Sequence, residues 1–244
     1  MRSNLSVINV YKKKSIKSKL VTQLLYGESF KIIKKNGAWI KIKNDSDNYK
    51  GFIRKNNFPI AQINTHKVCN LSANLYKKPS LKYKIKKKIS FGSKVKIIER
   101  EKKFYKFDNF WIKKKDLKEK KYKTKDLFKN IKKFINTKYI WGGKHYTGVD
   151  CSGLIQVLLN FNNRSCPRDS KDQIKYFKKK IKLKNIRKND LIFWKEHVAI
   201  AISKHSLIHA YGPLKKTIRM PIKKTINRIY KTANLKVTGI RRIT

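Results

Sequence analysis

The sequence is poor in cysteine and in acidic residues, and it has no long apolar run. Three cysteines occur in 244 residues, Cys69, Cys151 and Cys166, too few and too scattered for a disulfide framework. No CxxC pair is present, so we predict neither a zinc site nor another cofactor. No apolar stretch approaches the ~20 residues of a membrane-spanning helix. Residues 1–11 also lack the apolar centre of a signal peptide; a cytoplasmic protein is therefore expected.

Basic residues dominate the charge. The 64 lysines and arginines outnumber the 14 acidic residues, which gives a formal net charge of +50. Such a charge attracts nucleic acids in general, but lysine is spread along the whole chain and no helix-turn-helix spacing occurs. We interpret the excess as the lysine bias of an AT-rich genome and do not expect a nucleic-acid partner. A cationic field would still favour capture of anionic substrates.

The run from Tyr139 to Leu154 is the most informative part of the chain. It ends in Asp150-Cys151-Ser152-Gly153, after which apolar residues recur at helical spacing. Asp150 is a favourable N-cap, so Cys151 should lie in the first turn of a buried helix. A helix N-terminus lowers the pKa of a thiol, which predicts that Cys151 is a nucleophile. Its backbone amide is a candidate oxyanion donor.

Two histidines further along the chain supply a base and an orienting group. His197 opens a β-branched apolar run that ends near Ser203, and His209 follows a second apolar run. If these runs form a hairpin that turns near Ser203, the two histidines lie opposite each other, within reach of a hydrogen bond. We predict His197 as the general base and later general acid, and His209 as the residue that fixes its tautomer.

These motifs resemble the NlpC-type (p60-like) cysteine peptidases of bacterial cell walls. The resemblance spans residues 122–244 and includes Trp-Gly-Gly before the cysteine motif, Pro167-Arg168-Asp-Ser170-Lys-Asp-Gln173 and Asn189-Asp190-Leu-Ile-Phe. It departs from the family at Asn189, where glycine is usual, and at Glu196, where small or polar residues are common. It implies a papain-like α+β domain with helices at 126–135 and 170–177 and an antiparallel sheet from about Asp190 onward.

The first half of the chain is an internal duplication. Residues 10–20 align without gaps to residues 75–85, and the same offset pairs Gly27 with Gly92. The first copy contains a loop of about six extra residues near 44–50, and after this loop Phe52 aligns with Trp111. The copies resemble tandem bacterial SH3-like barrels, so we expect two small β-barrels at 1–60 and 66–118 before a peptidase domain at 122–244.

In related recycling enzymes with this domain order, an acidic residue and a tyrosine of the first barrel bind the free α-amine of the substrate, together with the aspartate beside the cysteine. By motif position these residues are Glu28, Tyr49 and Asp150. The resemblance also implies a pocket lined by Trp141, Ser152, Arg168 and Ser170. Arg168 has the fork geometry that suits a substrate carboxylate.

Together these features predict a cysteine peptidase that hydrolyses the γ-D-glutamyl–diamino acid bond of peptidoglycan-derived peptides with a free N-terminal L-alanine. The resemblance supplies this bond. One alternative is an exported, periplasmic or secreted hydrolase that cuts intact peptidoglycan. The other is a basic, non-catalytic module that binds cell wall or nucleic acid, and the presence of Cys151, His197 and His209 argues against it.

Overall fold

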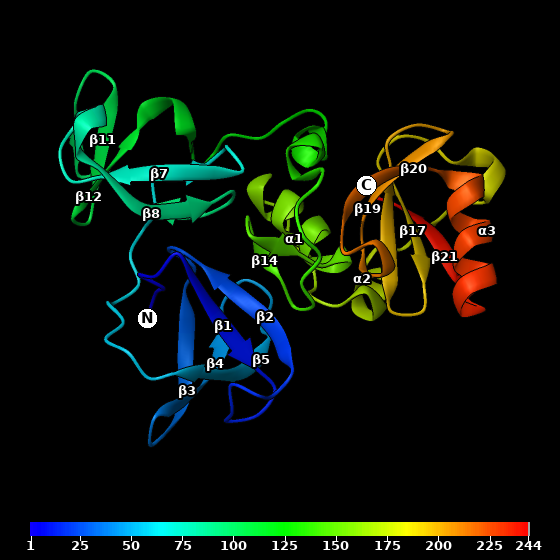
Figure 1. Ribbon diagram of the computed structural model, residues 1–244, viewed down its shortest axis with the longest axis horizontal. Helices are drawn as coiled ribbons and strands as arrows, with labels where there is room; N and C mark the ends of the chain where they lie inside the picture. Colours follow the sequence, from blue (N-terminus) through cyan, green and yellow to red (C-terminus); the bar gives the residue numbers. More distant parts are fainter. Residues whose placement is uncertain (244) are drawn as a thin grey trace. The chain divides into compact units, whose positions relative to one another are not determined.

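A computed structural model describes residues 1–243 and divides the chain into two compact units (Figure 1). The N-terminal unit comprises residues 1–123 and the short segment 144–146. The C-terminal unit comprises residues 124–143 and those from 147 onward. None of the helices in residues 1–243 combines the length and the hydropathy of a membrane span.

The N-terminal unit consists almost entirely of short antiparallel strands. Its first sheet contains β1 (Val7–Tyr11), β2 (Leu20–Leu25), β3 (Phe30–Asn36), β4 (Trp39–Asn44) and β5 (Lys50–Arg54). The remaining elements are β6 (His66–Val68), β7 (Ser72–Tyr76), η1 (Leu81–Tyr83), β8 (Lys84–Ser90), β9 (Lys94–Val95), β10 (Glu99–Arg100), β11 (Phe104–Phe107), β12 (Phe110–Lys113), η2 (Lys114–Asp116), β13 (Leu117–Glu119) and β14 (Lys144–His145).

The internal duplication is visible in the strand order of the two five-stranded sheets. The first sheet runs β2-β1-β5-β4-β3, and the second runs β8-β7-β12-β11-β10 when read from its opposite edge. The register agrees as well, since Tyr11 pairs with Phe52 in the first copy and Tyr76 with Trp111 in the second. Gly27 and Gly92 both adopt positive φ, +76° and +82°, a conformation that glycine adopts without steric cost.

The expected loop insertion distinguishes the copies. In the first copy, residues 45–49 connect β4 to β5, and the amide of Asn44 donates to the carbonyl of Tyr49. In the second copy, only residues 108 and 109 separate β11 from β12. Asp108 of this tight turn forms a two-pronged ion pair with Arg2, with N–O distances of 2.9 and 2.7 Å, and accepts a hydrogen bond from the Tyr26 hydroxyl. These bonds tie the two copies together.

The C-terminal unit contains a six-stranded antiparallel sheet with helices on both faces (Figure 1). The strand order is β16-β21-β17-β18-β19-β20. The elements of this unit are η3 (Lys129–Phe134), β15 (Gly148–Val149), α1 (Cys151–Phe161), α2 (Ser170–Tyr176), β16 (Lys179–Lys180), η4 (Leu183–Asn185), β17 (Asp190–Trp194), β18 (His197–Ala201), β19 (Ser206–Tyr211), η5 (Gly212–Leu214), β20 (Lys216–Pro221), α3 (Ile222–Ala233) and β21 (Gly239–Arg242).

The helices differ from expectation in two places. The helix predicted over residues 126–135 is shorter than expected and is not an α-helix: residues Lys129–Phe134 form the 3₁₀ helix η3. Its apolar residues Phe128, Ile131 and Phe134 recur every third residue and are buried, which is the repeat of a 3₁₀ helix. Helix α3 was not predicted. Its Ile222 and Ile229 pack with Trp194 and Ile240 in a core on one face of the sheet, while α1 packs against β18 and β19.

Candidate active site

Cys151 begins helix α1, as predicted. Asp150 is the N-cap residue, and its Oδ1 atom accepts a hydrogen bond of 2.7 Å from the Gly153 amide. The helix is buried along almost its whole length, because its apolar residues face the sheet on one side and α2 on the other. The sequence thus places the Cys151 thiol at the positive end of a buried helix.

The Asp150 carboxylate is the centre of a buried hydrogen-bond network. Besides capping α1, it accepts a bond of 2.7 Å from the Gly142 amide and two bonds from the Arg168 guanidinium, of 3.1 and 2.7 Å. The Arg168 Nη1 atom also donates to Ser152 Oγ at 3.0 Å. The carboxylate therefore connects the loop at Gly142, the start of helix α1 and the segment that precedes α2.

This network changes the interpretation of Arg168. We expected its fork to hold a substrate carboxylate, but both Nη atoms bond to Asp150. Arg168 is only 2% exposed. The bidentate geometry is present, and its partner is a carboxylate of the protein itself. A buried charge needs such a partner, because leaving it unpaired in the interior costs several kcal/mol.

The environment of the Cys151 thiol does not lower its pKa, as its position at a helix N-terminus alone would. The residue is 4% exposed, and its Sγ atom lies 3.8 Å from the carbonyl oxygen of Glu196. Burial, reinforced by the charge of Asp150, raises the pKa of Cys151 to about 12, although the backbone amides of Val198 and Ser152 favour the thiolate. The expected lowering of the pKa by the helix is outweighed by desolvation. The ligand-free thiol is thus neutral at pH 7.

The two histidines contact each other directly. The Nε2 atom of His197 lies 2.9 Å from the Nδ1 atom of His209. Burial lowers the pKa of His197 to about 4, against the opposing effect of the Asp150 charge. Burial and the neighbouring His197 lower the pKa of His209 well below its usual value. Both imidazoles are therefore neutral at pH 7, so one nitrogen of the contact donates and the other accepts.

The two histidines lie on a hairpin, as expected, but the centre of its turn is displaced by one residue from the predicted position. Ile200 pairs with Ile208 and Ala201 with Leu207, which centres the turn on Lys204 instead of Ser203. The amide of Ile202 donates to the carbonyl of Ser206 at 2.8 Å and closes the loop. His197 and His209 are consequently diagonal neighbours on one face of the sheet, a separation that imidazoles can still bridge.

The hydrogen bonds fix one productive tautomer. To accept the thiol proton at Nδ1, His197 must carry its hydrogen on Nε2 and donate it to His209 Nδ1. His209 then carries its hydrogen on Nε2, and that atom lies 3.5 Å from the Sδ atom of Met220. A thioether sulfur is a weak acceptor. The order Cys151, His197, His209, Met220 therefore allows a consistent set of donors and acceptors.

Sequence reasoning assigned no role to two residues near the cysteine. Gln173 is fully buried, and its Nε2 atom donates to the carbonyls of Ser152 and Pro167 at 3.0 and 2.9 Å. It holds the first turn of α1 against α2. The phenol of Tyr139 has a raised pKa because it is buried near the thiol of Cys151 and the carboxylate of Asp150. Glutamine in the motif after Arg168 was the available signal for Gln173.

A cavity of about 370 Å³ opens beside His197. Tyr139, Glu196, Tyr211 and Arg228 are among its lining residues. It thus presents two aromatic rings and side chains of both charges next to the predicted base. A cavity of this size accommodates one amino-acid residue of a peptide.

Four other residues were predicted to contact the substrate, and their surroundings differ from one another. Trp141 is 43% exposed, and Ser170 is a buried residue at the start of α2. Glu28 lies in the N-terminal unit, where it is buried and its carboxylate contacts Lys144 Nζ at 3.1 Å and accepts from the Leu25 amide. Tyr49, in the loop before β5, donates its backbone amide to Asp47 Oδ1 at 3.0 Å. Substrate contacts for these residues remain predictions.

Comparison with protein families gives two matches. Residues 136–237 match the NlpC/P60 family, and residues 6–58 match the bacterial SH3 domain. A gamma-D-glutamyl-L-lysine dipeptidyl-peptidase of Bacillus subtilis is 24% identical over 215 residues, which cover 78% of this chain and 71% of the relative. A protein of the same name from Bacillus cereus is 25% identical over 229 residues, with coverages of 79% and 68%.

A solved structure supports the same fold. The crystal structure of an NlpC/P60 family protein from Bacillus cereus superimposes with a TM-score of 0.83 at 19% identity, covering 99% of this chain and 98% of that one. The homology to peptidases argues against the non-catalytic alternative. With the buried cysteine and the histidine pair on adjacent elements, residues 136–237 form an NlpC/P60 cysteine peptidase domain, which follows an N-terminal bacterial SH3 region in a chain homologous to the gamma-D-glutamyl-L-lysine dipeptidyl-peptidases.

Proposed function

We propose that this peptidase hydrolyses the γ-D-glutamyl–diamino acid bond of peptidoglycan stem peptides or muropeptides that have a free N-terminal L-alanine. One observation supports this substrate most strongly. The similarity to the gamma-D-glutamyl-L-lysine dipeptidyl-peptidases extends over 215 residues, whereas the match to the peptidase family is confined to residues 136–237. The likeness thus includes the N-terminal unit, which peptidases that consist of the catalytic domain alone do not possess.

In this proposal Cys151 is the nucleophile. Its Sγ atom attacks the γ-carbonyl carbon of D-glutamate while the thiol proton moves to Nδ1 of His197. His209 holds His197 in the required tautomer through the 2.9 Å contact. The backbone amide of Cys151 donates to the oxyanion of the tetrahedral intermediate. A neutral thiol and a neutral imidazole suit this route, because the base takes the proton as the bond to carbon forms.

The intermediate collapses when the C–N bond breaks. His197 then gives its proton to the leaving amine of the diamino acid, which departs and leaves a thioester between Cys151 and the L-Ala-D-Glu dipeptide. Water, deprotonated by His197, hydrolyses the thioester and restores the thiol. The cavity lined by Glu196 and Arg228 lies beside His197; we assign it to the diamino acid, whose amine and carboxylate complement these two charges.

Product analysis by mass spectrometry tests the proposal. The substrates are L-Ala-γ-D-Glu-L-Lys and L-Ala-γ-D-Glu-diaminopimelate, each beside its N-acetylated form, with Cys151→Ala as the control. We expect release of the free diamino acid only from unblocked peptides and only when Cys151 is present. Comparison of the two substrates identifies the preferred diamino acid.

The alternatives predict different results. Equal cleavage of the acetylated peptides, together with solubilisation of intact sacculi, would favour a wall hydrolase over a dipeptidyl-peptidase. Cleavage that survives in Cys151→Ala would contradict the assigned nucleophile. If the folded, reduced protein cleaves neither peptide, the substrate proposal fails.

A further inference from the structure

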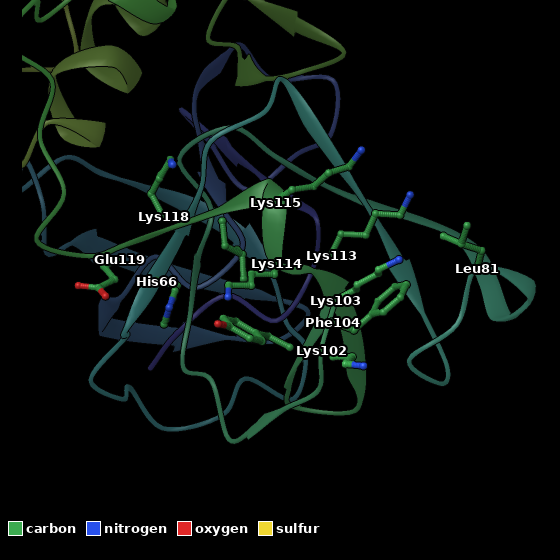
Figure 2. A pocket seen from close by; sticks show the side chains of 12 residues that line it. His66, Leu81, Lys102, Lys103, Phe104, Lys113, Lys114, Lys115, Lys118 and Glu119 are labelled. Carbon is green, nitrogen blue, oxygen red and sulfur yellow. The ribbon is translucent and has the colours of Figure 1, made fainter.

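The second SH3-like copy contains a large pocket that the peptidase chemistry does not use. Its volume is about 700 Å³, and its lining residues all belong to the segment 66–119. Figure 2 shows the lysine side chains arranged around it. Its apolar lining residues are Leu81, Phe104 and Leu117. Pockets of this size bind small ligands or segments of polymers in other proteins.

The lining is strongly cationic. Half of its twelve residues are lysines, against the single carboxylate of Glu119. The lysines are Lys102, Lys103, Lys113, Lys114, Lys115 and Lys118. Among the ion pairs of residues 1–243, none involves these six side chains. Like charges in a concave site repel one another and focus a positive potential into it. A bound anion would reduce this repulsion.

The backbone of the second copy brings these lysines together. The β11–β12 hairpin places Phe104 opposite Lys113. Just beyond this pair, the amide of Lys114 donates to the carbonyl of Lys103 at 2.9 Å. Two lysine-containing segments, 102–103 and 113–115, are thereby held side by side at the rim of the pocket.

The first copy provides an internal control for the general lysine bias. It contains the equivalent backbone bond, from the Lys55 amide to the Ala38 carbonyl, also 2.9 Å long. By this alignment, segment 102–103 corresponds to Gly37-Ala38, and segment 113–115 corresponds to Arg54-Lys55-Asn56. Five basic residues in the second copy thus replace two in the first. Because one genome encodes both copies, a uniform bias toward lysine does not account for the difference.

The chemistry of the lining narrows the ligand. No arginine is present among the lining residues, so the pocket offers no planar fork; its lysines act as point charges, which bind phosphate without a fixed bidentate geometry. Other side chains already surround the ring of Tyr105. Its centroid lies 5.7 Å from the ring centroid of His66, 5.6 Å from Arg100 Cζ and 5.8 Å from Lys114 Nζ. An occupied ring is a poor platform for a nucleobase, which argues against single-stranded nucleic acid. The concave shape does not fit a flat membrane surface.

We propose that this lysine pocket binds a polymer of phosphodiester-linked polyols, with phosphates at the lysines and the carbon spacers against the apolar lining residues. The pocket then acts as a docking site, separate from the peptidase chemistry, which holds the enzyme on an anionic polymer.

Binding of a synthetic glycerol phosphate decamer, measured by calorimetry over a series of salt concentrations, tests this. We expect the triple variant K103Q/K114Q/K118Q to weaken binding by about 10- to 100-fold at low salt. The matched control is K12Q/K13Q/K14Q, which removes the same charge from exposed residues of the first copy. This control should change the affinity by less than about threefold, and both variants should retain wild-type peptide cleavage and thermal stability.

Two further ligands of equal length test the chemical class. Oligo(dT) and oligo-L-glutamate should bind more weakly than the glycerol phosphate decamer, and the two triple variants should reduce their binding equally. Equal loss of decamer binding in both triple variants would show that only the general positive field matters and would overturn the proposal. Tighter, pocket-dependent binding of oligo(dT), or absence of decamer binding at low salt, would also overturn it.

Discussion

The Nε2 atom of His209 lies 3.5 Å from the Sδ atom of Met220, on the neighbouring strand β20. This contact completes the chain of donors and acceptors that begins at Cys151. It also explains why a buried histidine, with a pKa far below its usual value, has a defined neutral tautomer.

Replacing Met220 tests this contact. Met220→Leu keeps most of the volume and removes the acceptor for His209, so we expect kcat/KM to fall about 2- to 10-fold, the equivalent of one modest hydrogen bond. The loss should appear in kcat, with KM unchanged and the acidic limb of the pH–rate profile shifted. Ile218→Leu, on the same strand and against the same core, is the control. Identical pH profiles for Met220→Leu and the wild type would contradict the assigned tautomer.

The raised pKa of Cys151 predicts the pH dependence of its alkylation. Because burial raises this pKa to about 12, the thiolate fraction should grow about tenfold per pH unit throughout the range from pH 6 to pH 9. The rate of iodoacetamide modification, followed by mass spectrometry of the peptide that contains Cys151, should rise accordingly. A thiolate already formed by proton transfer to His197 would instead give a rate independent of pH in this range.

The ion pair between Asp150 and Arg168 should be important for stability. Arg168→Met leaves a buried carboxylate without its guanidinium, and we expect a loss of about 3–5 kcal/mol in the free energy of unfolding, measured with urea. The control is Lys188→Met. Its ion pair with Asp126 is solvent-accessible, with side chains 57% and 26% exposed, and should contribute less than about 1 kcal/mol. Equal losses for both variants would contradict this difference.

Asn189 tests the backbone conformation where this chain departs from the family's usual glycine. Its φ is +73°, a left-handed conformation that asparagine tolerates better than most residues. Asn189→Ala and Asn189→Gly both remove the side-chain amide, so their difference isolates the backbone. Alanine should be less stable than glycine by about 1–2 kcal/mol in thermal or urea unfolding. Equal stability of the two variants would rule out strain at this position.

The sequence was sufficient to predict features that depend on local pattern. The helix at Cys151 and its Asp150 cap follow from one capping residue and an apolar repeat, and the duplication follows from two aligned segments. Glu196 has a φ of +58°, so both positions that depart from the family lie in the left-handed region. The glycine that is usual at position 189 adopts this conformation without steric cost.

Other features depend on contacts between distant residues and could not be predicted. The partner of Arg168 is a carboxylate eighteen positions earlier, and no local rule distinguishes it from a substrate. The pKa of Cys151 depends on burial, which competes with the helix terminus and prevails. Helix α3 was overlooked because its many lysines and β-branched residues obscure an apolar repeat at Ile222, Ile226 and Ile229.

The many bonds to Asp150 have a consequence for genetic screens. One carboxylate accepts hydrogen bonds from Gly142, Gly153 and Arg168, so any replacement removes a helix cap, a loop anchor and a charge partner together. A search for inactive variants will therefore recover position 150 whether or not the carboxylate touches the peptide. Only substrates altered at their amino terminus, supplied to the intact enzyme, can separate recognition from folding at this residue.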